Sequence, residues 1–251
     1  ARGGMGAVTQ ALASSFTASG GTILTDSEVS QVIINNGRAE GVALVNGDEV
    51  RGRLVISNAD VKRTFLKLVD EKELPEKFVH RVKHFKMRGS SGKVNIALDG
   101  LPQFAGLPKE SAWGTIDIGG DFDYIERAYD DYKYGSWSKR PFLDIVIPTT
   151  VDPTMAPPGK HFMSVFVQYV PPLVEGRPWS DADRFAFRES VFDQLVTQCP
   201  GFRKVVLHAE VPHALDEAVG PFHAGVVPLE RLFGGACEHH EDAGGVGAVA
   251  V

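Results

Sequence analysis

The sequence has 251 residues, of which 43% are hydrophobic and 23% charged, enough for one large domain or two modest ones with buried cores. Lysine and arginine total 26 against 32 acids, and the net charge of −6 is spread along the chain, which argues against nucleic acid as a partner. The two cysteines, Cys199 and Cys237, lack the spacing of a disulfide framework or a zinc site, which fits the reducing cytoplasm. The longest apolar stretch, residues 162–170, is far shorter than the ~20 residues of a transmembrane helix, so no membrane span is expected.

The first third of the chain predicts a helix, a β-meander and a second helix. Apolar side chains recur at helical spacing over residues 5–19, and two glycines follow, so this segment predicts an amphipathic helix. Asn-Gly pairs then separate β-prone runs, which favours tight hairpins between three strands at residues 29–34, 38–45 and 49–53. The continuous apolar run at 54–57 predicts a strand buried on both faces. A helix capped within Asn58-Ala59-Asp60 is predicted to run through Val69.

The rest of the chain alternates between strand and helix patterns after a helix that Pro75 opens. Strands are predicted at 93–98, 113–118, 142–147, 161–170 and 205–211, and helices at 122–133 and 181–199. We therefore predict an α/β (mixed α+β) fold in which a mixed sheet is covered by helices. Residues 234–251 are rich in glycine and alanine without periodicity, and we expect them to be unstructured.

A glycine-rich turn, Gly3-Gly4-Met5-Gly6, opens the first predicted helix. The amino terminus of a helix can attract an anionic phosphate or the edge of a flavin ring. A dinucleotide fingerprint, however, needs a strand before the turn and glycine at the position of Thr9. The residues alone therefore leave both a cofactor contact and an ordinary helix start open.

The remaining motifs do not form a site in the sequence. His80 and His84 lie one helical turn apart, but no third metal ligand accompanies them. Cys237, His239 and His240 resemble metal ligands only in composition, within a segment expected to be unstructured, so we predict no metal site. No nucleophile elbow is present, and no catalytic residue can be named from these patterns.

Two blocks of the sequence resemble a known family. The first block runs through residues 3–6, 20–23, 28–29, 37–42, 46–49 and 55–60, and the second through residues 147–159 and 164–169. Together they resemble the phytoene-desaturase-related branch of the FAD-dependent amine-oxidase-like superfamily, and the second block narrows the resemblance to one subgroup of that branch. The similarity covers about residues 2–211.

The resemblance implies FAD as cofactor and two domains, a partial FAD-binding domain over residues 1–70 and a substrate-binding domain over 71–233. The second domain would close an apolar cavity over the flavin. By the resemblance, Val29 offers its backbone amide and carbonyl to the FAD adenine. Residues implied to lie near the cofactor are Gly3, Gly4, Met5, Gly6, Asn58, Ala59 and Asp60. Flavins carry the hydride chemistry themselves, so the lack of a catalytic triad is compatible with this function.

The sequence also departs from the family pattern at two places. Family members begin with a strand, a Gly-x-Gly-x-x-Gly turn and a helix that hold the FAD pyrophosphate; nothing of this kind precedes Ala1, so we expect poor FAD affinity. A family segment resembling Leu-Thr-Pro-Trp is replaced here by Pro212-His213-Ala214-Leu215-Asp216. A one-base frameshift near Val211 would explain this replacement and the composition of residues 234–251.

These observations leave three hypotheses. The first is a fragment of an FAD-dependent oxidoreductase that removes hydride from an apolar or amine-bearing substrate and is inactive alone. The second is a non-catalytic binding module that keeps an apolar cavity and pairs with a separate FAD-domain polypeptide. The third, supported least, is a protein whose tail binds metal.

Overall fold

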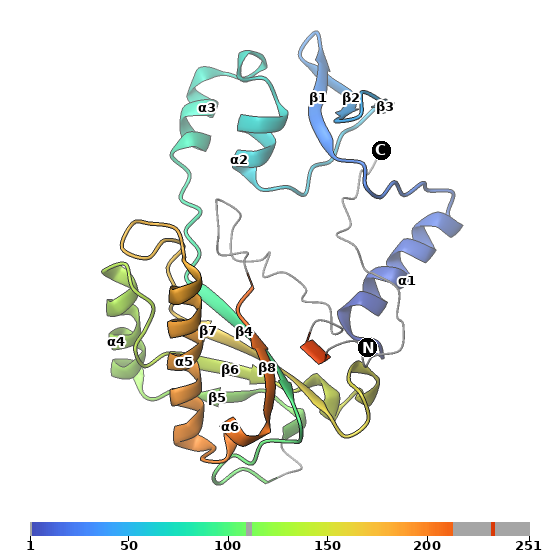
Figure 1. Cartoon of the computed structure of the whole chain (residues 1–251). Coiled ribbons are helices and arrows are strands. Elements are labelled where there is room, and N and C mark those ends of the chain that lie inside the picture. Colours follow the sequence, from blue (N-terminus) through green and yellow to red (C-terminus); the bar gives the residue numbers. More distant parts are fainter. Residues whose placement is uncertain (1, 109–111, 213–231, 234–251) are drawn as a thin grey trace. The chain divides into compact units, whose positions relative to one another are not determined.

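The computed structural model describes residues 2–108, 112–212 and 232–233 (Figure 1). These residues form two compact units. We call residues 8–87 the meander unit, and residues 2–7 together with the described residues from 88 onward the sheet unit. The predicted unstructured tail, 234–251, lies outside the described residues.

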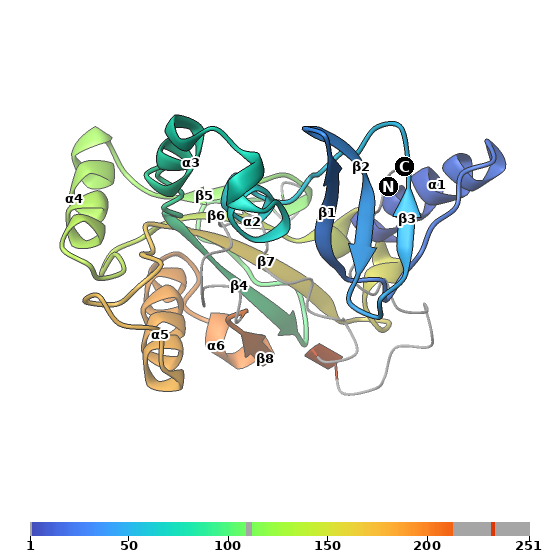
Figure 2. The same ribbon diagram turned by 90° about the horizontal axis from the view of Figure 1, so that it is seen from above.

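Three antiparallel strands form the meander, in the order β1 (Val29–Asn35), β2 (Arg38–Leu44) and β3 (Glu49–Arg51) (Figure 2). The turn between β1 and β2 has positive φ angles at both central residues, 50° at Asn36 and 74° at Gly37. Two such residues make the tight turn whose twist matches that of a hairpin. The predicted meander is therefore confirmed, and the Asn-Gly pair is its local cause.

The helices predicted before residue 88 are also confirmed. They are α1 (Gly4–Ala18), α2 (Val61–Arg63), which continues as a π-helical turn (Thr64–Leu68), and α3 (Glu76–Lys83). A 3₁₀ turn (Glu71–Glu73), which was not predicted, lies between α2 and α3 in the sequence. Asp60 caps α2, since its carboxylate accepts hydrogen bonds of 2.9 Å from the backbone N–H groups of Lys62 and Arg63. None of the residues of α1 is buried, so its apolar stripe does not contribute to a core in this structure.

The prediction of a strand at residues 54–57 is wrong. The structure shows an isolated bridge at Ile56, and the side chains of Leu54 and Ile56 are 64% and 61% exposed. A strand buried on both faces needs paired neighbours and covering layers. Within the described chain, the three-stranded sheet of this unit does not include residues 54–57.

Five strands form the sheet of the second unit, in the order β5-β6-β7-β4-β8. Their bounds are β4 (Ser91–Leu98), β5 (Ile116–Ile118), β6 (Phe142–Val146), β7 (His161–Gln168) and β8 (Val206–Glu210). The predicted fold class is confirmed with one difference: each pairing in this sheet is antiparallel, so the sheet is not mixed in strand direction. Apolar alternation identifies strands but carries no information about their direction.

Helices α4 (Phe122–Lys133), α5 (Asp181–Gln198) and α6 (Phe202–Val205) accompany this sheet. Two 3₁₀ turns, Pro148–Thr150 and Pro153–Met155, lie in the proline-rich loop between β6 and β7. A capping box of Ser180 and Asp183 begins α5. An ion pair with Arg177, 2.6 Å long, together with the Ser180 hydrogen bonds, holds the pKa of Asp183 well below its usual value.

The core lies between α5 and one face of the sheet (Figure 1). The strand residues that enter it alternate along each strand: Val94, Ile96, Leu98, Leu143, Ile145, Met163, Val165 and Val167. Phe187 of α5 is fully buried, with its ring 5.7 Å from that of Trp179 and 6.3 Å from that of Trp137. The period of two along the strands thus fixes which face meets the helix.

Two phenylalanines of α5 provide a matched test of this packing. Phe187 is 0% exposed and Phe185 is 58% exposed. Phe187→Ala should lower the free energy of unfolding by about 3–5 kcal/mol, because it leaves a cavity between helix and sheet. Phe185→Ala should cost less than about 1 kcal/mol. Urea denaturation of the two variants measures the difference, and equal losses would contradict this placement of α5.

Candidate functional site

The face of the five-stranded sheet opposite the core carries polar side chains. Successive strand residues point to opposite faces, so the residues between the core positions lie on this face. We use the name polar face for the group Lys93, Asn95, Asp117, Asp144, Ser164, Phe166 and Glu210, and the apolar side chains of Ala97, Phe142, Val146 and Phe162 lie on the same side of the sheet.

Strand register arranges these residues in two rows. In the first row, Asp117 pairs with Asp144, Asp144 with Phe166, and Phe166 with Lys93. In the second row, Asn95 of β4 pairs with Ser164 of β7 on one side and with Glu210 of β8 on the other. Residues directly opposite in neighbouring strands have Cβ atoms about 4.5–5.5 Å apart, so each row is a set of neighbouring side chains.

Burial shifts the pKa values of two charged groups in the first row. Desolvation lowers the pKa of the Lys93 ammonium below its usual value. Desolvation raises the pKa of the Asp144 carboxyl, and the neighbouring charge of Asp117 raises it further. Perturbed groups of this kind gather at functional sites more often than elsewhere, and these two face the same side of one sheet.

Asn95 is the most deeply buried polar residue of this face, at 4% exposure. Its Oδ1 atom is buried and has no hydrogen-bond partner in the described part of the chain. Ser164, directly opposite, is 7% exposed. This face was not predicted from the sequence, although Lys93 and Asn95 alternate with Val94 and Ile96 in a predicted strand, a pattern that places both polar residues on one side.

The glycine-rich turn lies in the sheet unit and holds a carboxylate of the protein itself. The Gly3 N–H donates to Asp152 Oδ2 over 2.5 Å. The hydroxyl of Thr154 and then the Gly3 N–H lower the pKa of Asp152. A Cβ on Gly4 would lie 3.0 Å from the terminal methyl carbon of Met155, so the turn packs against this loop. The amino-terminal end of α1 therefore meets an anion that is part of the chain.

Val29, the first residue of β1, lies in the meander unit. The carbonyl of Glu28 accepts a 2.9 Å hydrogen bond from the N–H of Val45, so Glu28 directs its carbonyl toward β2. Backbone groups of consecutive strand residues point to opposite edges, which turns the N–H and C=O of Val29 away from β2. In the described sheet β1 has a neighbour only on the β2 side, so these groups lie at an edge without a paired strand.

The other implied cofactor residues, Asn58, Ala59 and Asp60, follow in the meander unit before α2. The Asp60 carboxylate is used in the helix cap, and the Ala59 carbonyl accepts a 3.3 Å hydrogen bond from the Thr64 hydroxyl. The structure thus places Val29 and residues 58–60 in one unit, and the glycine-rich turn, Gly3, Gly4, Met5 and Gly6, in the other unit.

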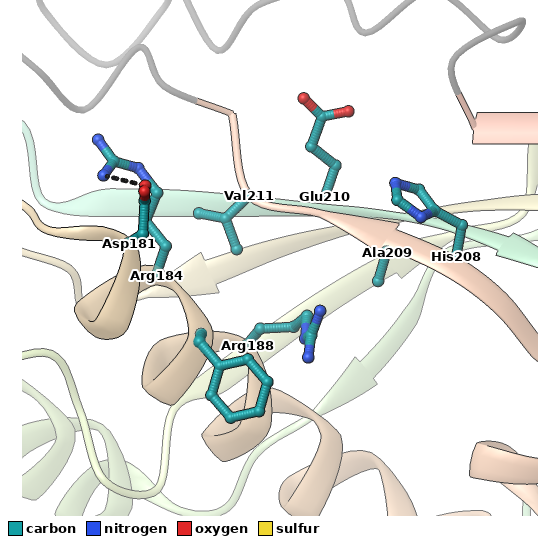
Figure 3. Close-up of a pocket in the computed structure, with 8 residues that line it drawn as sticks. Asp181, Arg184, Arg188, His208, Ala209, Glu210 and Val211 are labelled. Carbon is teal, nitrogen blue, oxygen red and sulfur yellow. Dashed lines mark ion pairs between the residues drawn. The ribbon is translucent and has the colours of Figure 1, made fainter.

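A groove of 460 Å³ lies between α5 and the edge strand β8 (Figure 3). Its charged lining is mixed, with Arg184 and Arg188 on one hand and Asp181 and Glu210 on the other, and His208 also lines it. Asp181 and Arg184 form an ion pair of 3.6 Å within the groove. The balance of charges gives this groove no preference for an anionic or a cationic ligand.

Among the residues with a described position, no group of three or more His, Cys, Asp and Glu side chains comes together. The ring centroids of His80 and His84 lie 4.2 Å apart, and the two ring planes are tilted by 31°. No helix of the described ranges is both long and apolar enough to cross a membrane.

Comparison with known proteins shows where the chain belongs. Residues 1–185 match the family described as flavin containing amine oxidoreductase. The mouse pyridine nucleotide-disulfide oxidoreductase domain-containing protein 2 is 37% identical over 250 residues, which cover 92% of this chain and 43% of that protein. A chloroplastic prolycopene isomerase of Daucus carota is 26% identical, covering 83% of this chain and 32% of the relative.

Two solved structures share the fold of this chain. An oxidoreductase from Methanosarcina mazei superposes with a TM-score of 0.56 at 23% identity, covering 84% of this chain and 43% of that one. A Pyrococcus furiosus protein gives a TM-score of 0.55 at 21% identity. The chain therefore spans less than half the length of the relatives it matches. By the family match over residues 1–185 and the identity to the mouse protein, the chain belongs to the family of flavin containing amine oxidoreductases.

Proposed function

We propose that this chain works as a fragment of an FAD-dependent oxidoreductase and does not turn over substrate alone. The meander unit would contribute to the FAD site, and the sheet unit would form most of a substrate-binding domain. The observation that carries the proposal is the family match over residues 1–185. When bound, FAD would accept hydride from an apolar or amine-bearing substrate.

The outer edge of β1 fits an adenine. One N–H donor and one C=O acceptor on the same residue match the neighbouring acceptor and donor on the edge of an adenine ring. Val29 has both groups turned away from β2, at an edge without a neighbouring strand in the described sheet. The contact would use backbone groups alone, which any residue except proline supplies at this position.

The polar face would bind the reacting part of the substrate. It combines a cationic ammonium at Lys93 with the carboxylates of Asp117 and Asp144, all on one side of the sheet. Burial already perturbs the pKa values of Lys93 and Asp144, so a bound ligand that excludes more water would perturb them further. In this proposal the face orients the substrate and excludes water, while the flavin supplies the redox chemistry.

One observation favours a second function, a non-catalytic binding module with a separate FAD-domain partner. The Asp152 carboxylate lies at the glycine-rich turn, where the family resemblance places the cofactor. A carboxylate there repels a phosphate. A purified protein that folds without flavin absorbance and shows no affinity for added FAD would support this second function.

Proline at position 29 tests the FAD contact. Val29→Pro removes one outward N–H while leaving the β2 pairing intact, since proline is tolerated at the first residue of an edge strand. FAD affinity, measured by quenching of flavin fluorescence, should fall about fivefold to tenfold, the effect of one hydrogen bond. Val29→Ala keeps the N–H and should bind FAD as the unmodified chain does. Equal affinity of all three proteins would argue against adenine at this edge.

The charge of the polar face gives a pH-dependent prediction. The folded-state pKa of Asp144 is raised, so its contribution to stability is present at low pH and is lost as the pH rises through that pKa. Asp117→Asn removes the neighbouring charge and should lower the pKa of Asp144, which reduces this loss. The increase in the melting temperature of the variant over that of the unmodified chain should therefore be larger at pH 7 than at pH 3.

Glu126→Gln, an exposed change on α4, serves as the control for this experiment. It removes one carboxylate without changing the polar face, so any increase in melting temperature should be small and should not depend on Asp144. An NMR titration of the Asp144 carboxyl carbon measures the pKa directly. An Asp144 pKa that stays unchanged in Asp117→Asn would show that the two carboxylates do not interact.

A further inference from the structure

Asn95 is an unusual residue for the centre of a sheet. It lies in β4, which is paired on both sides, and its strand neighbours Val94 and Ile96 are fully buried. Asparagine is depleted in strands, and a buried amide oxygen without a hydrogen bond costs free energy. Almost all buried polar groups of folded proteins are hydrogen-bonded, so this acceptor calls for a donor that the described chain does not supply.

The surroundings of Asn95 hold both hydrogen-bond acceptors and donors. Glu210 lies directly opposite on β8, and Asp144 lies on the same face two strands away. The Ser164 hydroxyl, directly opposite on β7, both donates and accepts. Lys93, two residues earlier on β4, shares the face. A molecule bound here would meet donors as well as acceptors, and at Asn95 Oδ1 itself it would gain from an N–H or O–H group.

We propose that Asn95 is a ligand-positioning residue whose Oδ1 accepts a hydrogen bond from an N–H or O–H group of the molecule bound at the polar face. The proposal rests on the proposed function, which makes this face the substrate surface. It narrows the substrate class: the ligand carries a hydrogen-bond donor at the end that meets β4. A pure hydrocarbon would leave Asn95 Oδ1 without a partner and would bind less tightly.

Three compounds with one skeleton test this. 4-Phenylbutylamine and 4-phenylbutanol carry a donor group, and butylbenzene carries none. Binding to the full chain is measured by the shift in melting temperature and by the NMR shifts of the Asn95 side-chain amide. We expect both donor compounds to bind about tenfold more tightly than butylbenzene and to shift the Asn95 amide resonances. Equal affinities for the three compounds, or no binding of any of them, would overturn the proposal.

Substitution of Asn95 separates ligand positioning from a structural role. Asn95→Leu should raise the melting temperature, because it replaces a buried acceptor that lacks a partner with an apolar side chain, and it should abolish the preference for donor compounds. Asn35→Leu, at the exposed end of β1, should leave the preference unchanged. An Asn95→Leu protein that is less stable and keeps the preference would show that Asn95 is structural.

A separate measurement of flavin binding distinguishes a failure of this proposal from a failure of the proposed function. Flavin binding is measured separately on the same proteins, by fluorescence quenching with FAD. A chain that binds FAD but does not discriminate among the three compounds contradicts only the role of Asn95. A chain that discriminates among the compounds but has no affinity for FAD supports the role of Asn95 and contradicts the flavin function.

Discussion

The antiparallel register around β4 is the constraint on which the sheet unit depends. Because side chains alternate along a strand, pairing β4 with β7 and β8 sends Val94, Ile96 and Leu98 toward α5 and sends Lys93 and Asn95 to the other face. A shift of one residue would expose the core and bury an ammonium against α5. The packing of α5 therefore fixes the register, and the register in turn gathers the polar groups on one face.

A similar constraint acts in the meander unit. The hydrogen bond between Val45 and Glu28 sets the phase of β1, and that phase turns the backbone groups of Val29 to the edge of β1 that has no paired strand among the described residues. Both candidate binding surfaces thus follow from strand pairing. Backbone contacts between strands do not depend on particular side chains, which is consistent with a shared fold at 23% identity to a solved oxidoreductase.

Local patterns predicted most of the fold. The Asn36-Gly37 turn and the helix cap within residues 58–60 each depend on neighbouring residues, and the structure has the elements they predict. Strand direction, and the fate of residues 54–57, depend on partners distant in the sequence and could not be predicted locally. The polar face was missed for the same reason, because Asp117, Asp144 and Ser164 meet Lys93 and Asn95 only through long-range pairing.

An NMR titration of the isotope-labelled chain with FAD tests the flavin assignment most directly, since chemical shifts detect even weak binding. If adenine binds the outer edge of β1, we expect saturable chemical-shift changes of the Val29 amide and of its neighbours on this strand. AMP should produce the same changes. Shifts confined to residues of the α5–β8 groove, or an unchanged Val29 amide at saturating FAD, would contradict a cofactor site on the meander.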